Sequence, residues 1–457
     1  LDSASQLDRE RAILRLLARP EVKAAIGRVE ALYAGDPQAR TEAGAARLKL
    51  AAQSIGVSAI NYALGEDATR AEVIWNVNAP HRWHGMAVPG SGFGIDNPDN
   101  IYMNFTVDGA ARYRLHGRVP NPGPVQLHIE VRDSIPGMGE MLVEGGRMLA
   151  TLQTEQMQIG PDGRFVVTLD SAPAAGRINH MVIPGDGHYI VGVRQLLTDW
   201  SRQRPIALRL ERLEPKVRPA PRDYARLARR SAEILDRIAP YWMDYNNRFL
   251  FSREPNRFAP TRLRPGGRGI STSCHYALAG DEALVITVDA LGAISLGCQI
   301  TDPWGVAYEY DVRTSSLNHV QARPDAAGSF TFVISARDPG FANWLDSGGH
   351  SSGISVLRWQ GLPDGADPAR AIRMERGVKL SNLAAGTGPA QPRRSRRPAQ
   401  DPGTRLCRAA ALLSSALQDQ VRTLLADHDR SGIGVTRYQA WHDRSVDYPQ
   451  PLHPAHT

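Results

Sequence analysis

The feature that most constrains the fold is a long succession of short β-rich segments with no helix between them. Seven such segments lie between residues 71 and 214, and six more lie between 283 and 380. Clusters of Pro, Gly and Asp separate the segments, as in Gly160-Pro161-Asp162-Gly163, which is typical of a hairpin turn. A parallel sheet would need a helix after nearly every strand. We therefore expect a mainly β fold of antiparallel sandwich or jelly-roll layers in two halves, with helical additions.

Helical periodicity covers residues 1–65, and a second helical segment at 222–243 interrupts the β series. The expected strands are 101–107, 111–119, 125–131, 148–159, 165–169, 189–197 and 206–213, followed by 283–288, 294–301, 307–312, 330–336, 354–359 and 372–380. The expected regions are an N-terminal helical cap (1–68), a first β-sandwich half (69–214), a helical and Pro/Arg-rich connection (215–268), a second β-sandwich half (269–385), and a Pro/Arg linker with a short helix at 405–426 and a flexible tail (386–457).

The two β halves share a short sequence echo. Segments 158–171 and 321–335 each place a Pro-Asp turn before a β-rich run. By itself the echo does not establish an internal duplication, because any hairpin built on Pro-Asp-Gly produces a similar pattern.

Composition excludes several classes of protein. The chain has 457 residues, 42% hydrophobic and 22% charged, which excludes a wholly disordered or collagenous protein. No apolar run approaches the roughly 18 residues of a membrane-spanning helix. The net charge of +7 owes much to arginines after residue 386, outside any expected folded domain, so we expect no nucleic-acid partner. Cys274, Cys298 and Cys407 lack metal-site or disulfide spacing and are expected to be free thiols. The default location is the cytoplasm, with a removed leader as the alternative, and homo-oligomerisation stays open.

The densest cluster of reactive side chains lies in the segment 338–353, between two expected strands. It holds Asp338, Asn343, Trp344, Asp346 and His350 together with adjacent glycines that can turn these side chains toward one point. Asp346 could orient His350 and raise its basicity, as a general base requires. The alternative is a polar corner in which Asp and Asn side chains cap backbone amides.

Within this segment, residues 349–353 match the Gly-x-Ser-x-Gly nucleophile elbow, with Ser351 as the nucleophile. That motif requires a sharp turn from a strand into a helix. A strand is expected to follow here instead, so we do not assign Ser351 a nucleophilic role.

A second dense segment runs from residue 94 to residue 114. Asp96, Tyr102 and Arg114 could supply a carboxylate, a phenol and a guanidinium to a polar or anionic ligand. The alternative is an Asx-type turn around Pro98. Some of the tryptophans near loops could also stack on a sugar ring or a planar apolar ligand.

Two further patterns suggest ligands and lack the partners that such sites need. His81 and His84 would hold a metal only with a third ligand such as Asp96, Asp99 or His275. The glycine-rich segment 90–94 lacks the lysine and the following helix of a phosphate-binding loop, so nucleotide binding of that type is not expected.

Several of these motifs resemble the bacterial domain-of-unknown-function family 1214, which often occurs beside the related family 1254. The resemblance rests on the motifs at 96–102, 108–114, 316–318, 338–340 and 343–350, the last running into 357–359. It covers about residues 90 to 380 and implies a β-sandwich, jelly-roll-like fold with helical additions. It implies no reaction, and the sequence after about residue 385 departs from the family.

The leading hypothesis is a cofactor-independent enzyme, a hydrolase, lyase or isomerase, in which Asp346 and His350 transfer protons with support from Asp338. Its substrate would be small or medium-sized and partly polar, such as a glycan fragment or an oxygenated lipid-like compound. The remaining expected site residues would bind the substrate: Asp96, Tyr102, Arg114, Asn343 and Trp344. A non-catalytic ligand-binding or assembly module is the alternative, and a metal-assisted hydrolase using His81 and His84 is the third.

Overall fold

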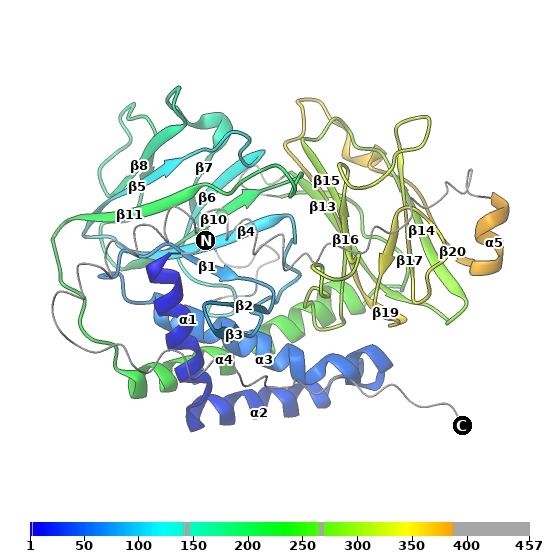
Figure 1. The fold of residues 1–457 in the computed structure, drawn as a ribbon, viewed down its shortest axis with the longest axis horizontal. Helices are drawn as coiled ribbons and strands as arrows, with labels where there is room; N and C mark the ends of the chain where they lie inside the picture. Colours follow the sequence, from blue (N-terminus) through cyan, green and yellow to red (C-terminus); the bar gives the residue numbers. More distant parts are fainter. Residues whose placement is uncertain (2, 140, 142–146, 265–268, 387–457) are drawn as a thin grey trace. The chain divides into compact units, whose positions relative to one another are not determined.

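The computed structural model of the chain describes residues 1, 3–139, 141, 147–264 and 269–386. The fold is mixed α/β with β predominant, and its strands form two halves, as expected (Figure 1). The N-terminal segment forms three α-helices, α1 (Ala4–Leu17), α2 (Pro20–Ala34) and α3 (Glu42–Gly65), joined by the short η1 (Pro37–Arg40). Ser3 and Thr41 begin α1 and α3 as N-caps, each accepting a backbone N–H with its side-chain oxygen. The expected N-terminal helices are therefore confirmed.

The first half is a sandwich of a five-stranded and a four-stranded sheet. The five-stranded sheet contains β1 (Ile74–Val77), β4 (Asn100–Asp108), β10 (His188–Leu196), β6 (Gln126–Arg132) and β7 (Met148–Gln153). The four-stranded sheet contains β11 (Ala207–Glu214), β5 (Arg112–Arg118), β8 (Arg164–Asp170) and β9 (His180–Val182). One hydrophobic core joins them, because alternate residues such as Ile129 of β6 and Leu115 of β5 point inward. A small hairpin, β2 (His81–Trp83) and β3 (Met86–Val88), and the short η2 (Thr154–Gln156) complete this half.

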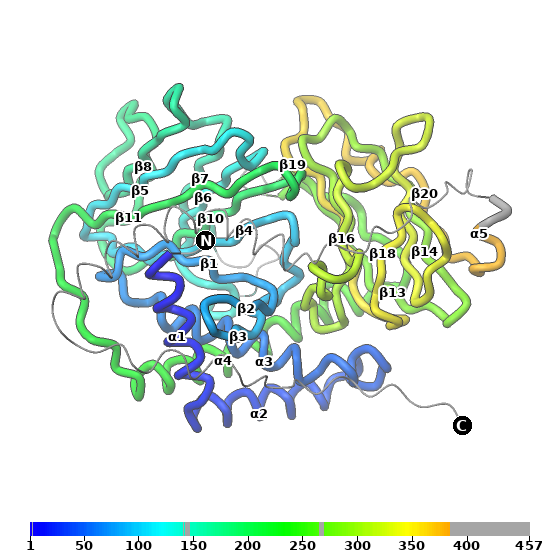
Figure 2. Tube along the Cα trace, viewed as in Figure 1, coloured from blue at the N-terminus to red at the C-terminus, as the bar shows by residue number. Residues whose placement is uncertain are grey.

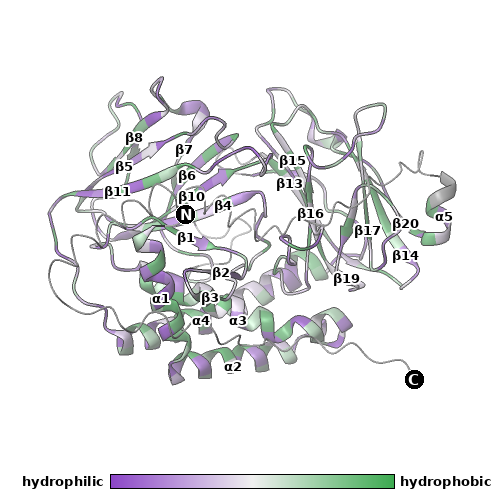
Figure 3. Cartoon of the chain, in the orientation of Figure 1, coloured by the Kyte–Doolittle hydropathy of each residue, from purple (hydrophilic) through white to green (hydrophobic). Residues whose placement is uncertain are grey.

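The second half repeats this plan. Its five-stranded sheet contains β12 (Arg262–Leu263), β13 (Ile270–Ala277), β19 (Ser352–Gln360), β15 (Ser295–Thr301) and β16 (Ser316–Asn318). Its four-stranded sheet contains β18 (Trp344–Asp346), β17 (Phe330–Ser335), β14 (Glu282–Val288) and β20 (Ile372–Lys379). A second core fills the space between the sheets, with Trp359 and Phe332 among its fully buried residues. The short η4 (Pro368–Arg370) and α5 (Leu380–Gly386) complete this half. Figure 3 shows hydrophilic and hydrophobic residues interspersed along the strands of both halves, as two-layered sheets require.

The two halves have the same strand order. β1-β4-β10-β6-β7 matches β12-β13-β19-β15-β16, and β11-β5-β8-β9 matches β20-β14-β17-β18. The parallel pairs β8–β9 and β17–β18 occupy equivalent places. The register also matches: Arg194 of β10 lies opposite His128 of β6, and Arg358 at the equivalent position of β19 lies opposite Gly297 of β15. The strand order thus supports the internal repeat that the sequence echo alone could not establish.

Helix α4 (Tyr224–Asn246) connects the halves and continues into η3, a π-helical turn (Asn247–Phe251). The trace in Figure 2 follows this connection from the first half to the second. Ile234, Leu235 and Ile238 of α4 share a buried cluster with residues of α2 and α3 and with Trp304 of the second half. The helices therefore pack on the sheets, as the expected cap and inserted helix require. No helix of the described ranges is long and apolar enough to cross a membrane.

The strands differ from expectation in several places. The strand expected at 148–159 ends at Gln153, and eight strands were not expected: β1, β2, β3, β9, β12, β13, β16 and β18. The expected strand at 307–312 is wrong: only an isolated bridge joins Thr301 to Ala307, and the backbone N–H groups of Val312 and Arg313 bond to the carbonyl of Glu309 in a turn. The longest unexpected strand is β13, in which serines, a threonine and a histidine alternate with or separate the inward-facing Ile270, Cys274 and Tyr276. The helix expected at 405–426 lies outside the described residues.

The segment 95–99 ties the halves together through polar contacts. Arg358 Nη2 donates to the carbonyl oxygen of Ile95 at 2.6 Å, and Gln299 Nε2 donates to that of Asp96 at 2.6 Å. Asn318 Nδ2 also donates to the Asp99 carboxylate at 2.9 Å. One of the two segments that stood out in the sequence therefore lies at the boundary between the halves.

Candidate binding cavity between the two sandwiches

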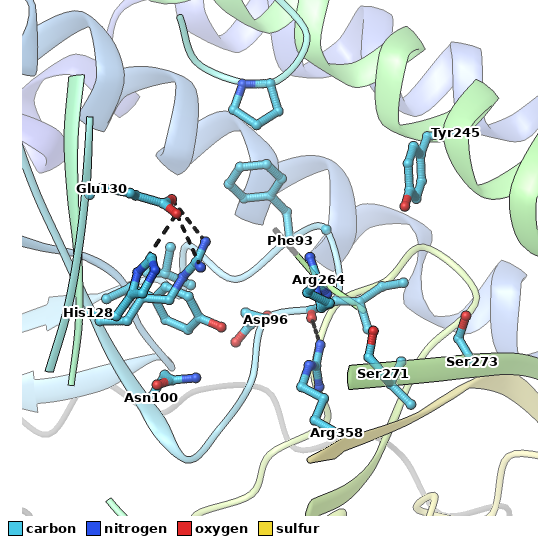
Figure 4. Close-up of a pocket in the computed structure, with 18 of the residues that line it drawn as sticks. Phe93, Asp96, Asn100, His128, Glu130, Tyr245, Arg264, Ser271, Ser273 and Arg358 are labelled. Atoms are coloured by element: carbon cyan, nitrogen blue, oxygen red, sulfur yellow. Dashed lines mark hydrogen bonds and ion pairs between the residues drawn. The ribbon is translucent and has the colours of Figure 1, made fainter. Parts of the chain in front are cut away.

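A cavity of about 340 Å³ lies between the outer faces of the two five-stranded sheets, with α4 and η3 as a further wall. Because odd-numbered residues of β4 and β6 point into the core of the first half, even-numbered residues such as Tyr102 and His128 point out into this cavity. Figure 4 shows side chains of both halves around it. Two carboxylates, Asp96 and Glu130, and six arginines line the cavity, so its lining is electropositive: Arg132, Arg194, Arg253, Arg262, Arg264 and Arg358.

The first half contributes an ion-paired cluster. Glu130 is buried and accepts from Arg132 Nε at 3.0 Å and from Arg194 Nη2 at 3.1 Å, and His128 Nδ1 lies 3.9 Å from its carboxylate. The Arg194 guanidinium also lies over the ring of Tyr102, at 5.6 Å from the centroid. One carboxylate is thus shared by two guanidinium groups.

The second half contributes the equivalent arginine with a different partner. Arg358 matches Arg194, and Gln299, the residue of β15 that matches Glu130, takes the place of the carboxylate. Arg358 Nη1 donates to Gln299 Oε1, so both acceptors of Arg358 within the described chain, this amide and the Ile95 carbonyl, are neutral. Burial lowers the pKa of Arg358 to about 10 and the charge of Arg264 also lowers it, whereas Tyr102 and Asp96 act in the opposite direction. This cation is partly desolvated, and no carboxylate of the described residues is hydrogen-bonded to it.

Asp96 is the second carboxylate of the cavity. Burial raises its pKa to about 7, although Arg358 acts in the opposite direction. Its Oδ1 is shielded from solvent and has no hydrogen-bond partner in the described chain, as is also true of Asn100 Oδ1 and Trp242 Nε1. Since shielded polar atoms in proteins nearly always have partners, these three atoms, all in side chains that line the cavity, indicate groups that a ligand could satisfy.

One wall of the cavity is aromatic. Trp242, Tyr245 and Phe249 follow one another at helical spacing along α4 and η3, and all three are half-buried. Their rings are in mutual contact, with centroids 5.2 Å apart for Trp242 and Tyr245 and 4.9 Å apart for Tyr245 and Phe249. Phe93 meets the Trp242 ring edge-on at 5.7 Å. We call these four residues the aromatic wall.

Of the residues expected in the second dense segment, two reach the cavity and one does not. Asp96 and Tyr102 line it, and the Tyr102 hydroxyl accepts from the backbone N–H of Asn97 at 2.9 Å. The expectation for Arg114 is wrong. Arg114 is exposed on the four-stranded sheet, because it alternates with Tyr113 and Leu115, which fill the core.

The segment 338–353 does not line the cavity, and the expected pairing of Asp346 with His350 is wrong. His350 Nδ1 lies 2.9 Å from the Glu42 carboxylate, at the start of α3. Asp346 Oδ1 accepts from the backbone N–H of Gly348, and its Oδ2 lies 3.6 Å from Arg313. Asp338 accepts from the backbone N–H of Gly340 at 2.8 Å. These contacts are those of the polar-corner alternative.

The side chains of Asn343 and Trp344 also form hydrogen bonds with backbone groups. Asn343 bridges to Arg323, accepting from its N–H and donating to its carbonyl, both at 2.8 Å. Asn179 of the first half bridges to Gln158 in the same way, and each asparagine directly precedes the short parallel strand of its half. Trp344 Nε1 donates to the carbonyl of Ser335. Asn343 therefore repeats a structural contact of the first half.

The contacts of Ser351 and His81, the remaining candidates, are those of structural residues. Ser351 leads directly into β19 and not into a helix, as the sequence led us to expect. His81 Nδ1 lies 2.8 Å from the carbonyl of Ala79, and its Nε2 lies 3.2 Å from the Glu10 carboxylate. Across the described ranges, no three His, Cys, Asp or Glu side chains gather as metal ligands.

Five residues of the cavity were not predicted from the sequence: His128, Glu130, Arg132, Arg194 and Arg358. In β6 three ionisable residues alternate with Leu127, Ile129 and Val131, which in the sequence is the pattern of an ordinary half-solvated strand, and yet every residue of the strand is buried. Ionisable residues on the outer face of a sheet normally meet solvent. Their burial needs the second sandwich, whose position the sequence does not reveal.

No family model matches the chain, and no curated protein matches it. The resemblance to family 1214 therefore stays a prediction. Among solved structures, the chain is similar to an uncharacterized protein from Burkholderia cenocepacia, with 25% identity and a TM-score of 0.60 over 81% of this chain and 100% of that chain. A protein from Vibrio parahaemolyticus matches with 10% identity and a TM-score of 0.38, over 63% of this chain and 91% of that chain. The first similarity supports the fold and supplies no activity.

Proposed function

We propose that the protein binds a small organic anion in the cavity between the two sandwiches, with Arg358 as its counter-ion. The observation that carries the proposal is the difference between equivalent arginines. Arg194 has the carboxylate of Glu130 as its partner, whereas the acceptors of Arg358 within the described residues are neutral. A partly desolvated cation in a cavity favours an anionic ligand, because the ligand supplies a hydrogen-bonded negative charge that the described part of the chain does not.

Isothermal titration calorimetry with acetate, benzoate and inorganic phosphate tests this proposal. We expect at least one of these anions to bind, and Arg358→Gln to weaken it by about 30-fold or more, as loss of a buried charge contact worth roughly 2 kcal/mol would predict. Gln299→Glu should weaken it as well, because the new carboxylate would pair with Arg358 as Glu130 pairs with Arg194. Arg114→Gln is the matched control, since Arg114 is exposed on the opposite sheet of the first half.

Absence of binding by all three anions, or equal affinity in Arg358→Gln and Arg114→Gln, would overturn the proposal. Circular dichroism and thermal unfolding of each variant show whether a loss of binding reflects a loss of fold. Gln299→Glu serves as the second variant if Arg358→Gln does not fold, because it leaves the Arg358 contact to Ile95 in place.

A second candidate is an acid–base enzyme, a hydrolase, lyase or isomerase, with the reaction in the same cavity. The observation that favours it is Asp96, a carboxyl group with a pKa of about 7 and a shielded oxygen without a partner. In this candidate Asp96 takes the proton-transfer role, in place of Asp346 and His350. Turnover of a bound carboxylate that disappears in Asp96→Asn while binding remains would distinguish the enzyme from the binding protein.

A further inference from the structure

We infer that the ligand is an aromatic carboxylate with a ring hydroxyl, a class of compound that the proposed function leaves unspecified. The inference rests on the anion site of the proposed function and adds two features of the same cavity. One is the aromatic wall, and the other is a set of shielded acceptors without a partner in the described chain, of which Asp96 Oδ1 and Asn100 Oδ1 lie close together in the sequence and Asn76 Oδ1 is a third.

The aromatic wall favours a flat apolar ring. Trp242 and Tyr245 of α4 and Phe249 of η3 line the cavity and are only half-buried, so part of their ring surface is open to it. Aromatic rings attract other rings edge-on or in offset stacks, as Phe93 and Trp242 already do. A ring carried by the anion would cover this remaining surface while its carboxylate meets Arg358.

The shielded acceptors favour a hydroxyl donor on the ligand. Asp96 belongs to the segment 95–99 that ties the two halves together, Asn100 begins β4 directly after it, and each presents one shielded oxygen without a partner in the described chain. Figure 4 shows Asp96 between the side of the cavity that carries His128 and Glu130 and the side that carries Ser271 and Arg358. A hydroxyl on the ring would donate to one of these oxygens and satisfy it.

The test compares four probes by calorimetry under one set of conditions: acetate, benzoate, 4-hydroxybenzoate and glucuronate. We expect benzoate to bind about tenfold or more tightly than acetate, because it buries a ring. We expect 4-hydroxybenzoate to bind about fivefold more tightly than benzoate, through one added hydrogen bond. Tyr245→Leu should reduce the preference for benzoate over acetate, and Asp96→Ala should remove the preference for the hydroxyl. Tyr224→Leu, a half-buried tyrosine of α4 outside the cavity lining, is the matched control.

The outcomes separate this inference from the proposed function. If acetate binds as tightly as benzoate, the ligand class is wrong while the anion site stands. If glucuronate binds more tightly than 4-hydroxybenzoate, an acidic sugar is the better ligand and the aromatic class is overturned. If none of the four anions binds, the proposed function fails as well. Because Tyr245 and Asp96 report on different parts of the ligand, a folding defect in one variant leaves the other as a test.

Discussion

The two sandwiches share a strand order and a register, yet the outer faces of their five-stranded sheets differ in chemistry. On the first half, β6 and β10 present His128, Glu130, Arg132 and Arg194. At the matching places the second half has Gly297, Gln299, Thr301 and Arg358. The inward faces stay apolar in both, because each must fill a core. The core residues preserve the architecture of both halves, whereas the residues of the outer face can differ and form a binding site. A single Glu-to-Gln difference gives Arg358 a neutral partner where Arg194 has a carboxylate, so that Arg358 can bind an anionic ligand.

The largest effect on stability is expected from Glu130→Gln, which makes the first half resemble the second at this position. The carboxylate has Arg132, Arg194 and His128 around it, and its loss leaves two guanidinium groups without their shared anion. We expect the free energy of unfolding to fall by about 3 kcal/mol, since breaking a buried ion pair typically costs this much. Urea unfolding followed by circular dichroism measures the change.

A loss below about 1 kcal/mol in Glu130→Gln would mean that the cluster is solvated and that the two halves do not differ as described. Thr301→Val, at the second-half position that matches Arg132, gives a comparison substitution on the outer face of the other five-stranded sheet.

The next largest effect is expected from substitutions of the two bridging asparagines, which test how similar the halves are. Asn179→Ala removes two side-chain hydrogen bonds to backbone, and Asn343→Ala removes the equivalent two and a third, from Asn343 Nδ2 to the carbonyl of Thr331. We expect the free energy of unfolding to fall by about 2 kcal/mol in Asn179→Ala and by somewhat more in Asn343→Ala, at about 1 kcal/mol per hydrogen bond. Anion affinity should not change in either variant, because neither residue lines the cavity. A cost in Asn343→Ala that exceeds the cost in Asn179→Ala by much more than the roughly 1 kcal/mol of the additional hydrogen bond, or a loss of binding in Asn343→Ala alone, would give Asn343 a role beyond the repeated corner.

The smallest effect is expected from Asp96→Asn, and it depends on pH. Burial raises the pKa of Asp96 to about 7, so the folded chain holds this proton between about pH 4 and 7 while the unfolded chain has lost it. The resulting stabilisation is complete below about pH 4 and is lost as the pH rises through 7. Asp96→Asn removes that dependence. The free energy of unfolding of Asp96→Asn should equal that of the wild type near pH 4 and exceed it by about 1–2 kcal/mol at pH 8. This difference is smaller than the full shift in the pKa of Asp96 implies, because the side chain is partly exposed.

Thermal and urea unfolding at several pH values measure this difference. Burial also raises the pKa of Asp99 and of Asp302 to about 6, and their contributions to the slope are common to both proteins. Parallel pH profiles for wild type and Asp96→Asn would show that Asp96 is solvated and would weaken its assignment as the proton-transfer group of the cavity.

The sequence predicted the fold well and the site only in part, for a physical reason. Alternating apolar residues identify a strand and its inward face, so most strands and all long helices could be placed. β13 was missed because Cys274 and Tyr276 fill its inward positions where Val or Ile would have been recognised. Asp96 and Tyr102 stood out because they cluster in a turn, whereas Arg358 stands alone in an ordinary strand pattern. The importance of Arg358 depends on which sheets face each other across the cavity, and only the tertiary structure shows that arrangement.

The few contacts that join segment 95–99 to the second half have a consequence for how the protein would respond to its ligand. Arg358 reaches a carbonyl of that segment and the cavity at once, so the site exists only while the two halves are docked. A ligand bound there would act by mass action on docking itself: at a concentration of 100 times its Kd it would add about 2.7 kcal/mol to the docked state. The ligand would then stabilise the docked arrangement of the two halves. Protection of segment 95–99 from proteolysis or amide exchange would therefore detect ligand binding, whatever reaction the cavity supports.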